Sequence, residues 1–185
     1  MARALTGVKT NSDFDAVLYE AGVEGIGSVQ APYRNINHRP AWTSGNGTGQ
    51  ANRVWYEASV VLAAAGTFNL DLFDFAGRDL GKGSGLDAQG LTMALTEIAY
   101  LSVRVTAAGS GGKLRLGGEG SGAAWNSGFG GSDSAVSHDI GLGGRKEWLA
   151  WTAGELLVAD STNHLLKFLG VTAEVTFDIV ILGRQ

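Results

Sequence analysis

The chain has 185 residues, including 29 glycines and no cysteine, with a charged fraction of 17% and a net charge of −4 at pH 7. This length is enough to bury a core without disulfides, and a hydrophobic content of 44% excludes disorder of the whole chain. The missing cysteines exclude thiolate chemistry, scattered basic residues give no nucleic-acid footprint, and no run of about 18 apolar residues predicts a membrane span. We therefore expect a soluble domain without a nucleic-acid or membrane partner.

The first 50 residues differ from the rest because glycine, asparagine, serine and threonine are frequent and apolar residues are sparse. Residues 12–21 are the one predicted helix here, and a single apolar face would carry Phe14, Val17, Leu18 and Ala21. The stretch from Gly22 to Gly49 reads as an extended segment with loops. We predict an N-terminal arm over residues 1–50 and a β-sandwich domain over residues 51–185.

Beyond the arm, apolar and polar residues alternate in short runs between glycine-rich turns, which is typical of strands. The predicted strands are residues 54–62, 67–73, 99–106, 113–116, 135–142, 147–151, 155–159, 163–169 and 172–182; residues 91–98 fit either a helix or a strand. The first two strands form a predicted hairpin, and so do the third and fourth. Because no helix of 10 to 15 residues separates the strands, we expect an all-β fold, a jelly-roll-like antiparallel β-sandwich with an extended N-terminal arm.

The alternation also predicts which side chains share a face of a strand. In the first predicted strand, one face carries Val54, Tyr56, Ala58, Val60 and Leu62. In the last predicted strand, one face carries Val175, Phe177, Ile179 and Ile181.

No set of residues predicts a catalytic centre, a cofactor site or a metal site. The three histidines lie in separate regions without metal-ligand spacing, and the neighbours His138 and Asp139 would point to opposite faces of a strand. The glycine-rich runs 81–85 and 109–113 resemble phosphate-binding loops only loosely, and the second leads into a strand rather than a helix. We expect no enzymatic activity; a hydrolase using scattered carboxylates is the least favoured reading.

Aromatic residues in polar or glycine-rich surroundings are the remaining candidates for function. Such residues anchor protein interfaces, stack on sugars, or pack on the chain's own core. The predicted interface residues are Tyr33, His38, Trp42, Trp125 and Phe129.

A characteristic strand and turn pattern runs through Thr67–Leu72, Ile98–Val105 and Trp125–Gly131 and ends in the most suggestive run, Val175–Gly183. In this pattern residues 65–183 resemble small β-sandwich virion accessory proteins of tailed bacteriophages, of the capsid decoration (cement) type. The resemblance implies a structural role without catalytic residues or cofactors, and it does not extend over the arm.

We therefore expect a capsid decoration protein that stabilises a phage head through subunit interfaces. Its expected partners are the major capsid protein or other virion proteins and further copies of itself, commonly as a homotrimer. The arm would grip the shell or a sister subunit, and the protein would reside in the virion, assembled in the host cytoplasm. The alternative is a tail-fibre, receptor-binding or carbohydrate-binding β-sandwich module.

Overall fold

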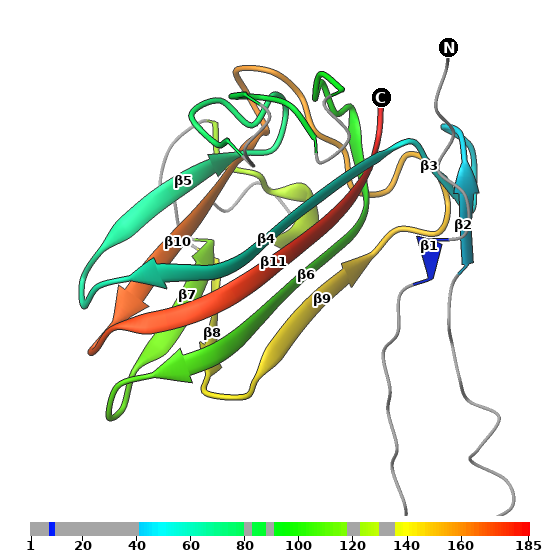
Figure 1. The fold of residues 1–185 in the computed structure, drawn as a ribbon. Helices are drawn as coiled ribbons and strands as arrows, with labels where there is room; N and C mark the ends of the chain where they lie inside the picture. The colour runs from blue at the N-terminus through cyan, green and yellow to red at the C-terminus, as the bar shows by residue number, and fades with distance from the viewer. Residues whose placement is uncertain (1–7, 10–40, 80–82, 88–90, 118–122, 130–135) are drawn as a thin grey trace, which may run out of the picture.

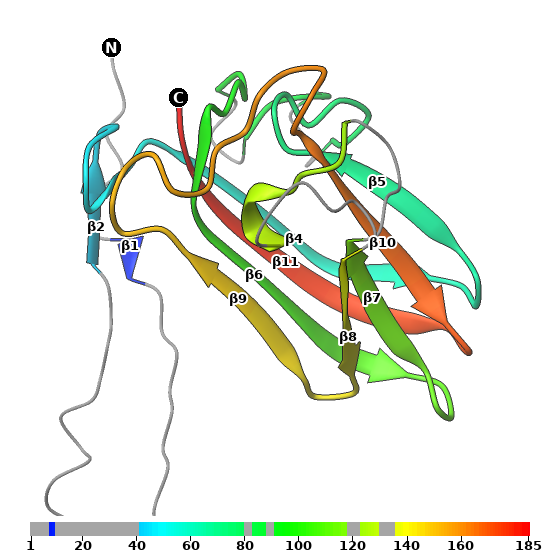
Figure 2. The ribbon, with the colours of Figure 1, turned by 180° about the vertical axis from the view of Figure 1, so that it is seen from behind.

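The computed structural model describes residues 8–9, 41–79, 83–87, 91–117, 123–129 and 136–185. Two four-stranded antiparallel sheets face each other as a β-sandwich (Figures 1 and 2). The front sheet contains, in spatial order, β4 (Arg53–Leu62), β11 (Val175–Arg184), β6 (Glu97–Ala108) and β9 (Arg145–Leu149). The back sheet contains β5 (Thr67–Asp71), β10 (Leu165–Val171), β7 (Lys113–Gly117) and β8 (Ser137–Gly141). The described residues hold no α-helix, only a 3-10 turn at Ser127–Phe129, and therefore no helix able to cross a membrane.

A small third sheet lies beside one end of the front sheet (Figure 1). It contains β1 (Val8–Lys9), β2 (Ala41–Ser44) and β3 (Gln50–Ala51). Strand β2 pairs antiparallel with β1 and parallel with β3. The predicted boundary of the arm falls inside β3, and the predicted helix over residues 12–21 lies outside the described residues.

The two predicted hairpins are wrong, because each short turn joins strands of opposite sheets. Strand β4 belongs to the front sheet and β5 to the back sheet, and the same holds for β6 and β7. Strand β6 pairs instead with β11 and β9, and β7 pairs with β10 and β8. A turn of a few residues can close a hairpin or cross between layers, and the alternation pattern does not distinguish the two.

The predicted faces hold along β11, where Val175, Phe177, Ile179 and Ile181 are all fully buried in the core. They fail in the first half of β4, where Trp55 points into the core and Tyr56 is half exposed. The cause is a bulge: the register of β4 with β11 shifts between Phe177 and Ile179, opposite Ser59, which has a φ of 56°. One additional residue reverses the facing of every side chain that precedes it.

Two further expectations change in the structure. Residues 155–159 do not form a strand; only isolated bridges occur there, at Leu157 and Ala159. The ambiguous run 91–98 is mostly irregular, and β6 begins at its end with Glu97.

Aromatic and branched side chains of both sheets fill the core between the layers. Phe168 of the back sheet stacks on Phe177 of the front sheet, with ring centroids 5.3 Å apart. Trp55 packs on Phe75 at 4.6 Å. The stacking of Phe168 on Phe177 joins the two layers through the core. The outer face of the front sheet takes no part in this contact.

Candidate interface on the front sheet

The outer face of the front sheet can be read as rows of side chains that lie across its strands. The first row is apolar and consists of Val54, Leu182, Tyr100 and Leu149. The second row changes from apolar to polar and consists of Tyr56, Val180, Ser102 and Glu147. The third row is charged and consists of Asp178, Arg104 and Arg145.

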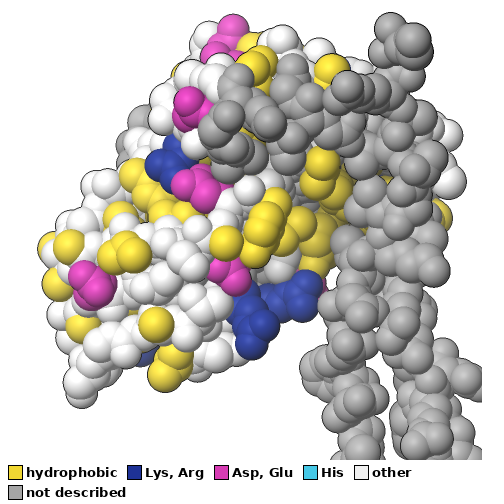
Figure 3. Space-filling view, viewed as in Figure 1, with side chains coloured by type: hydrophobic (Ala, Val, Ile, Leu, Met, Phe, Trp, Pro, Cys, Tyr) yellow, Lys and Arg dark blue, Asp and Glu magenta, His cyan; other side chains and the backbone are white. Residues whose placement is uncertain are grey.

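Part of this face is open and apolar. Tyr56 and Leu149, at opposite edges of the sheet, are each 51% exposed, and Val54 and Val180 are partly exposed. Apolar side chains gather over the middle of the face, with Lys and Arg side chains below them (Figure 3). An apolar area rimmed by charge is typical of a protein interaction surface.

A polar network joins all three rows and links β6 to the edge strand β9. The Arg145 guanidinium donates to Ser102 Oγ at 2.8 Å and to the Tyr100 hydroxyl, and it pairs with Glu147. The Tyr100 hydroxyl in turn donates to the Glu147 carboxylate. Burial and this carboxylate raise the pKa of Tyr100, so its hydroxyl stays a neutral donor.

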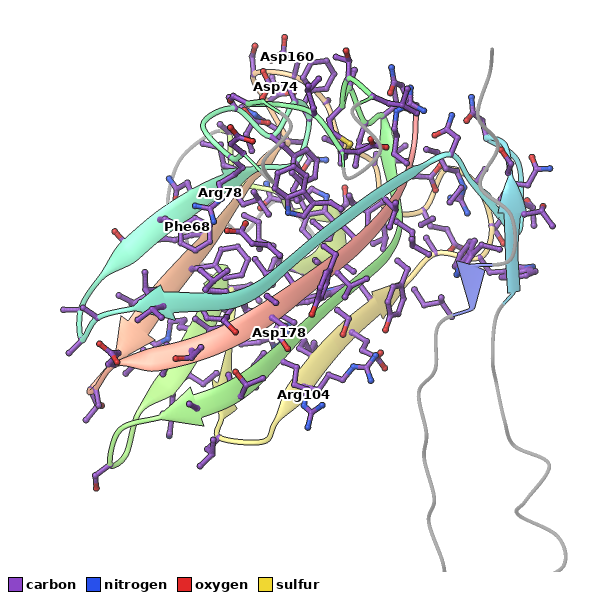
Figure 4. The ribbon with its side chains drawn as sticks, in the orientation of Figure 1. Phe68, Asp74, Arg78, Arg104, Asp160 and Asp178 are labelled. Carbon is purple, nitrogen blue, oxygen red and sulfur yellow. The ribbon has the colours of Figure 1, made fainter. Side chains whose placement is uncertain are left out.

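Arg104 and Asp178 lie opposite each other in the third row (Figure 4). Asp178 accepts the backbone N–H of Ser59 at 2.8 Å, which fastens the β4 bulge. Arg104 forms no ion pair within the described part of the chain and projects from β6 (Figure 4). It is therefore an exposed cation at the charged end of the face.

Trp42 covers the opposite, apolar end of the face. The side chain of this β2 residue is 2% exposed and belongs to a cluster separate from the main core. Its ring lies 5.2 Å from the Trp151 ring and 5.6 Å from the Arg184 guanidinium carbon. We call its surroundings the Trp42 pocket, formed by Ala51, Ala99, Tyr100, Trp151, Leu182 and Arg184.

Arg184 connects this pocket to the sandwich. Its guanidinium donates to the Gln50 carbonyl at 2.8 Å, to the Ala150 carbonyl at 2.8 Å and to Glu97 Oε1 at 2.5 Å. Glu97 Oε1 also accepts the backbone N–H of Gly154 at 2.9 Å. The last strand, the small sheet and the loop after β9 are thus joined through one buried ion pair.

The remaining predicted interface residues lie elsewhere or outside the described residues. Trp125 is 1% exposed in the main core and donates its indole N–H to the Leu157 carbonyl at 3.0 Å. Phe129 is half-buried, 6.1 Å from Trp125 and 5.3 Å from His138 between ring centroids. Trp42 and Trp125 are both buried within the described part of the chain, whereas Tyr33 and His38 lie outside it, so the interface role of all five residues stays a prediction.

Sequence reasoning missed three exposed side chains, Tyr56, Leu149 and Trp151, the last of which is 43% exposed. The alternation pattern placed Tyr56 on the same strand face as Leu62, and it assigned no face to Leu149. The signal that would have identified Tyr56 is the adjacent Trp55, since only one of two neighbouring strand residues can face the core.

Chemistry-bearing groups form no larger site among the described residues. His164 Nδ1 lies 2.9 Å from Asp71 Oδ2 at the start of β10, and the same carboxyl group accepts the Phe73 N–H through Oδ1. No described hydroxyl group is hydrogen-bonded to His164, and no three described acidic or histidine residues are grouped to hold a metal ion. His138 and Asp139 diverge as expected, His138 toward Phe129 and Asp139 toward Arg115 at 2.6 Å.

No model of a known protein family matches the sequence, and no curated protein matches it.

Proposed function

We propose that the protein is a structural virion component, a capsid decoration (cement) protein of a tailed phage. Its sandwich forms the body, and residues 1–50 form the arm that grips the shell or a sister subunit. It works by covering subunit boundaries, as a trimer on the capsid, and not by chemistry. The major capsid protein is its partner, and the virion is its location.

The strand order supports a jelly roll for the body. The eight sandwich strands can be numbered 1 to 8 in chain order from β4 to β11. The spatial order is then 1-8-3-6 in the front sheet and 2-7-4-5 in the back sheet. This arrangement corresponds to two interlocked Greek keys, an architecture frequent in capsid and lectin domains. Fold alone does not assign function, so the proposal needs a surface that suits it.

The single observation that carries the proposal is the outer face of the front sheet. Its apolar rows remain open at Tyr56 and Leu149, while the Trp42 pocket beside them already holds a segment of the arm. This face holds one extended segment and has an exposed apolar area beside it. Such a surface suits a protein that neighbouring subunits cover on assembly.

Co-sedimentation with empty capsids tests this proposal. The full chain should bind shells at a fixed stoichiometry, and a variant lacking residues 2–40 should remain folded but lose binding. The deletion stops at residue 40 so that the Trp42 pocket stays filled. If the full chain does not bind shells, the proposed function is wrong. If the truncated chain binds shells as well as the full chain, the proposed role of the arm is wrong.

A glycan-binding module is the competing function, favoured by the partly exposed Trp151 ring, because indole rings stack on sugars. A glycan array with the Trp151→Ala variant as control separates the two. Binding of a glycan that is lost in this variant would favour the module.

A further inference from the structure

We propose that Asn46 is a modification site, at which the folded chain deamidates spontaneously and thereby loosens its own small sheet. Asn46 and Gly47 are the one Asn-Gly pair in the sequence, and both are exposed in the turn between β2 and β3. Glycine has no Cβ, so its backbone nitrogen can approach the preceding side chain closely. This inference does not depend on the proposed function, because it concerns chemistry within one turn.

The reaction is an attack of the chain on itself. The backbone nitrogen of Gly47 forms a bond with Cγ of Asn46, and the bond between Cγ and Nδ2 breaks. The proton of the attacking nitrogen passes through water to Nδ2, which leaves as ammonia. Water then opens the succinimide ring at either of its two carbonyl groups, which gives aspartate or isoaspartate at position 46. Water is therefore the sole co-reactant.

Three neighbouring groups contact the three atoms whose bonding changes. Asn52 Nδ2 donates to Asn46 Oδ1 at 2.5 Å, where negative charge develops during the attack, and a donor at such an atom stabilises the intermediate. Gln50 Oε1 accepts the Gly47 N–H at 2.8 Å, so a flexible side chain, and not a strand carbonyl, holds the attacking nitrogen. The Gln185 carbonyl accepts Asn46 Nδ2 at 2.5 Å and orients the leaving group.

The three groups are themselves held in place by the fold. The Gln50 N–H donates to the Gly47 carbonyl at 3.0 Å. Asn52 is fixed at both ends of its amide, because Oδ1 accepts the Gln185 N–H at 3.1 Å and Nδ2 also reaches the Gln185 carbonyl at 3.3 Å. Reacting groups held together lose less entropy on reaching the transition state. We therefore expect the folded chain to react faster than the unfolded chain.

Deamidation removes a contact between the turn and the end of the front sheet. A carboxylate at position 46 cannot donate to the Gln185 carbonyl, because both groups are acceptors. The same turn includes Gly49, whose N–H donates to the Trp151 carbonyl at 2.9 Å, and the Trp151 ring lies 5.2 Å from the Trp42 ring. Loosening this turn should therefore weaken the seat of Trp42 in its pocket.

The test incubates the full chain at mildly alkaline pH and follows its peptides by mass spectrometry. The peptide that contains Asn46 should gain the mass that separates a hydroxyl from an amino group, and the other asparagines, as internal controls, should stay intact over the same time. The same chain unfolded in guanidinium chloride should react more slowly at Asn46. Equal or faster reaction in the unfolded chain overturns the proposal, and so does an Asn46 that reacts no faster than the other asparagines.

Two variants test the arrangement of the turn. Gly47→Ala should slow the reaction about tenfold, because a Cβ hinders the approach of the attacking nitrogen. This Cβ would meet the flexible Gln50 side chain at 3.0 Å, so the turn can accommodate it. Asn52→Asp keeps the acceptor for the Gln185 N–H but removes the donor to Oδ1, so it should also slow the reaction. Unchanged rates in both variants would show that the turn does not promote the chemistry.

The effect on the small sheet is measured separately. Asn46→Asp reproduces one product of the reaction and should speed the hydrogen exchange of the Gly49 amide with solvent, observed by NMR. Asn46→Ser removes the same donor without adding a charge and should cause a smaller change. A Gly49 amide that exchanges equally slowly in the wild-type protein and in Asn46→Asp would overturn the loosening of the small sheet.

Discussion

At the scale of single residues, Arg184 and Glu97 form the most enclosed ion pair among the described residues. Their side chains are 2% and 7% exposed, and their closest atoms lie 2.5 Å apart. A buried pair of this kind adds little net stability, but removing one partner leaves an uncompensated charge. This pair also contacts the small sheet, so its loss would be felt in the Trp42 pocket.

We expect Arg184→Met to lower the free energy of unfolding by about 3–5 kcal/mol, because the Glu97 carboxylate loses its counter-charge. Adding Glu97→Gln should recover part of this loss, since the amide oxygen still accepts the Gly154 N–H and no charge is buried. Urea unfolding of both variants gives the comparison. A double variant no more stable than Arg184→Met would contradict the charge explanation.

His138 makes a pH-dependent contribution. Burial among the aromatic rings and repulsion by Lys146 lower its pKa below the ordinary value of 6.5. Below pH 6.5 the unfolded chain therefore binds the proton more readily than the folded chain does. The contribution of neutral His138 to the free energy of unfolding is therefore fully present above pH 6.5. It is lost as the pH falls toward the lowered pKa of the folded state.

The urea midpoint of the wild-type protein should accordingly decrease between about pH 7 and about pH 5 by more than that of His138→Phe, which cannot titrate. The difference between the two plots of urea midpoint against pH isolates the contribution of His138 from that of other titrating groups. Parallel curves would show that His138 does not contribute.

At the scale of elements, strand β10 depends on a glycine. A Cβ on Gly170 would lie 2.3 Å from the Ala63 carbonyl oxygen, in the connection between β4 and β5. Gly170 also exchanges backbone hydrogen bonds with Ala65 and Gly66. No side chain fits there unless the backbone of one sheet moves away from the other.

Gly170→Ala should therefore lower the free energy of unfolding by about 1–3 kcal/mol through overpacking. Gly141→Ala, in β8, is the matched control: a Cβ there has no heavy atom within 4 Å, and its effect should stay within about 0.5 kcal/mol. Chemical denaturation of both variants is the measurement. Equal effects would mean that the loss reflects strand propensity and not the contact with Ala63.

Elements also show how far the sequence predicts the structure. Alternation correctly predicted the shared face of Val175, Phe177, Ile179 and Ile181 in β11, because this strand packs against the core along its length. It failed at β4, where a bulge near Ser59 depends on a long-range contact with Asp178. Strand pairing could not be predicted, since the partner of each strand is set by the packing of two layers.

The candidate interface was predictable only in part. Trp42 stood out as an aromatic residue in a polar segment, and the structure gives it a pocket of its own. Arg184 gave no signal, because a single basic residue after a strand is usually solvated. Its role depends on carbonyl groups from residues 50, 150 and 151, which only the fold brings together.

At the scale of the whole molecule, the described residues form a sandwich with its own core and a separate cluster around Trp42 beside it. Two deletions separate these parts: one lacks residues 2–40, and the other lacks residues 2–44 and with them Trp42. The first removes β1 but keeps Trp42 in its pocket, so its free energy of unfolding should stay within about 1 kcal/mol of the full chain. The second empties the pocket and exposes Leu182 and Tyr100, so it should be less stable by about 3 kcal/mol.

Urea unfolding of the two deletion variants and the full chain measures this difference. If the four residues from Ala41 to Ser44 account for most of the loss, then the arm is attached to the sandwich mainly through Trp42. The same contact would then set how firmly the arm can hold a neighbour. If both deletions are equally stable, the Trp42 pocket contributes nothing to the fold, and attachment of the arm must depend on the residues before β2.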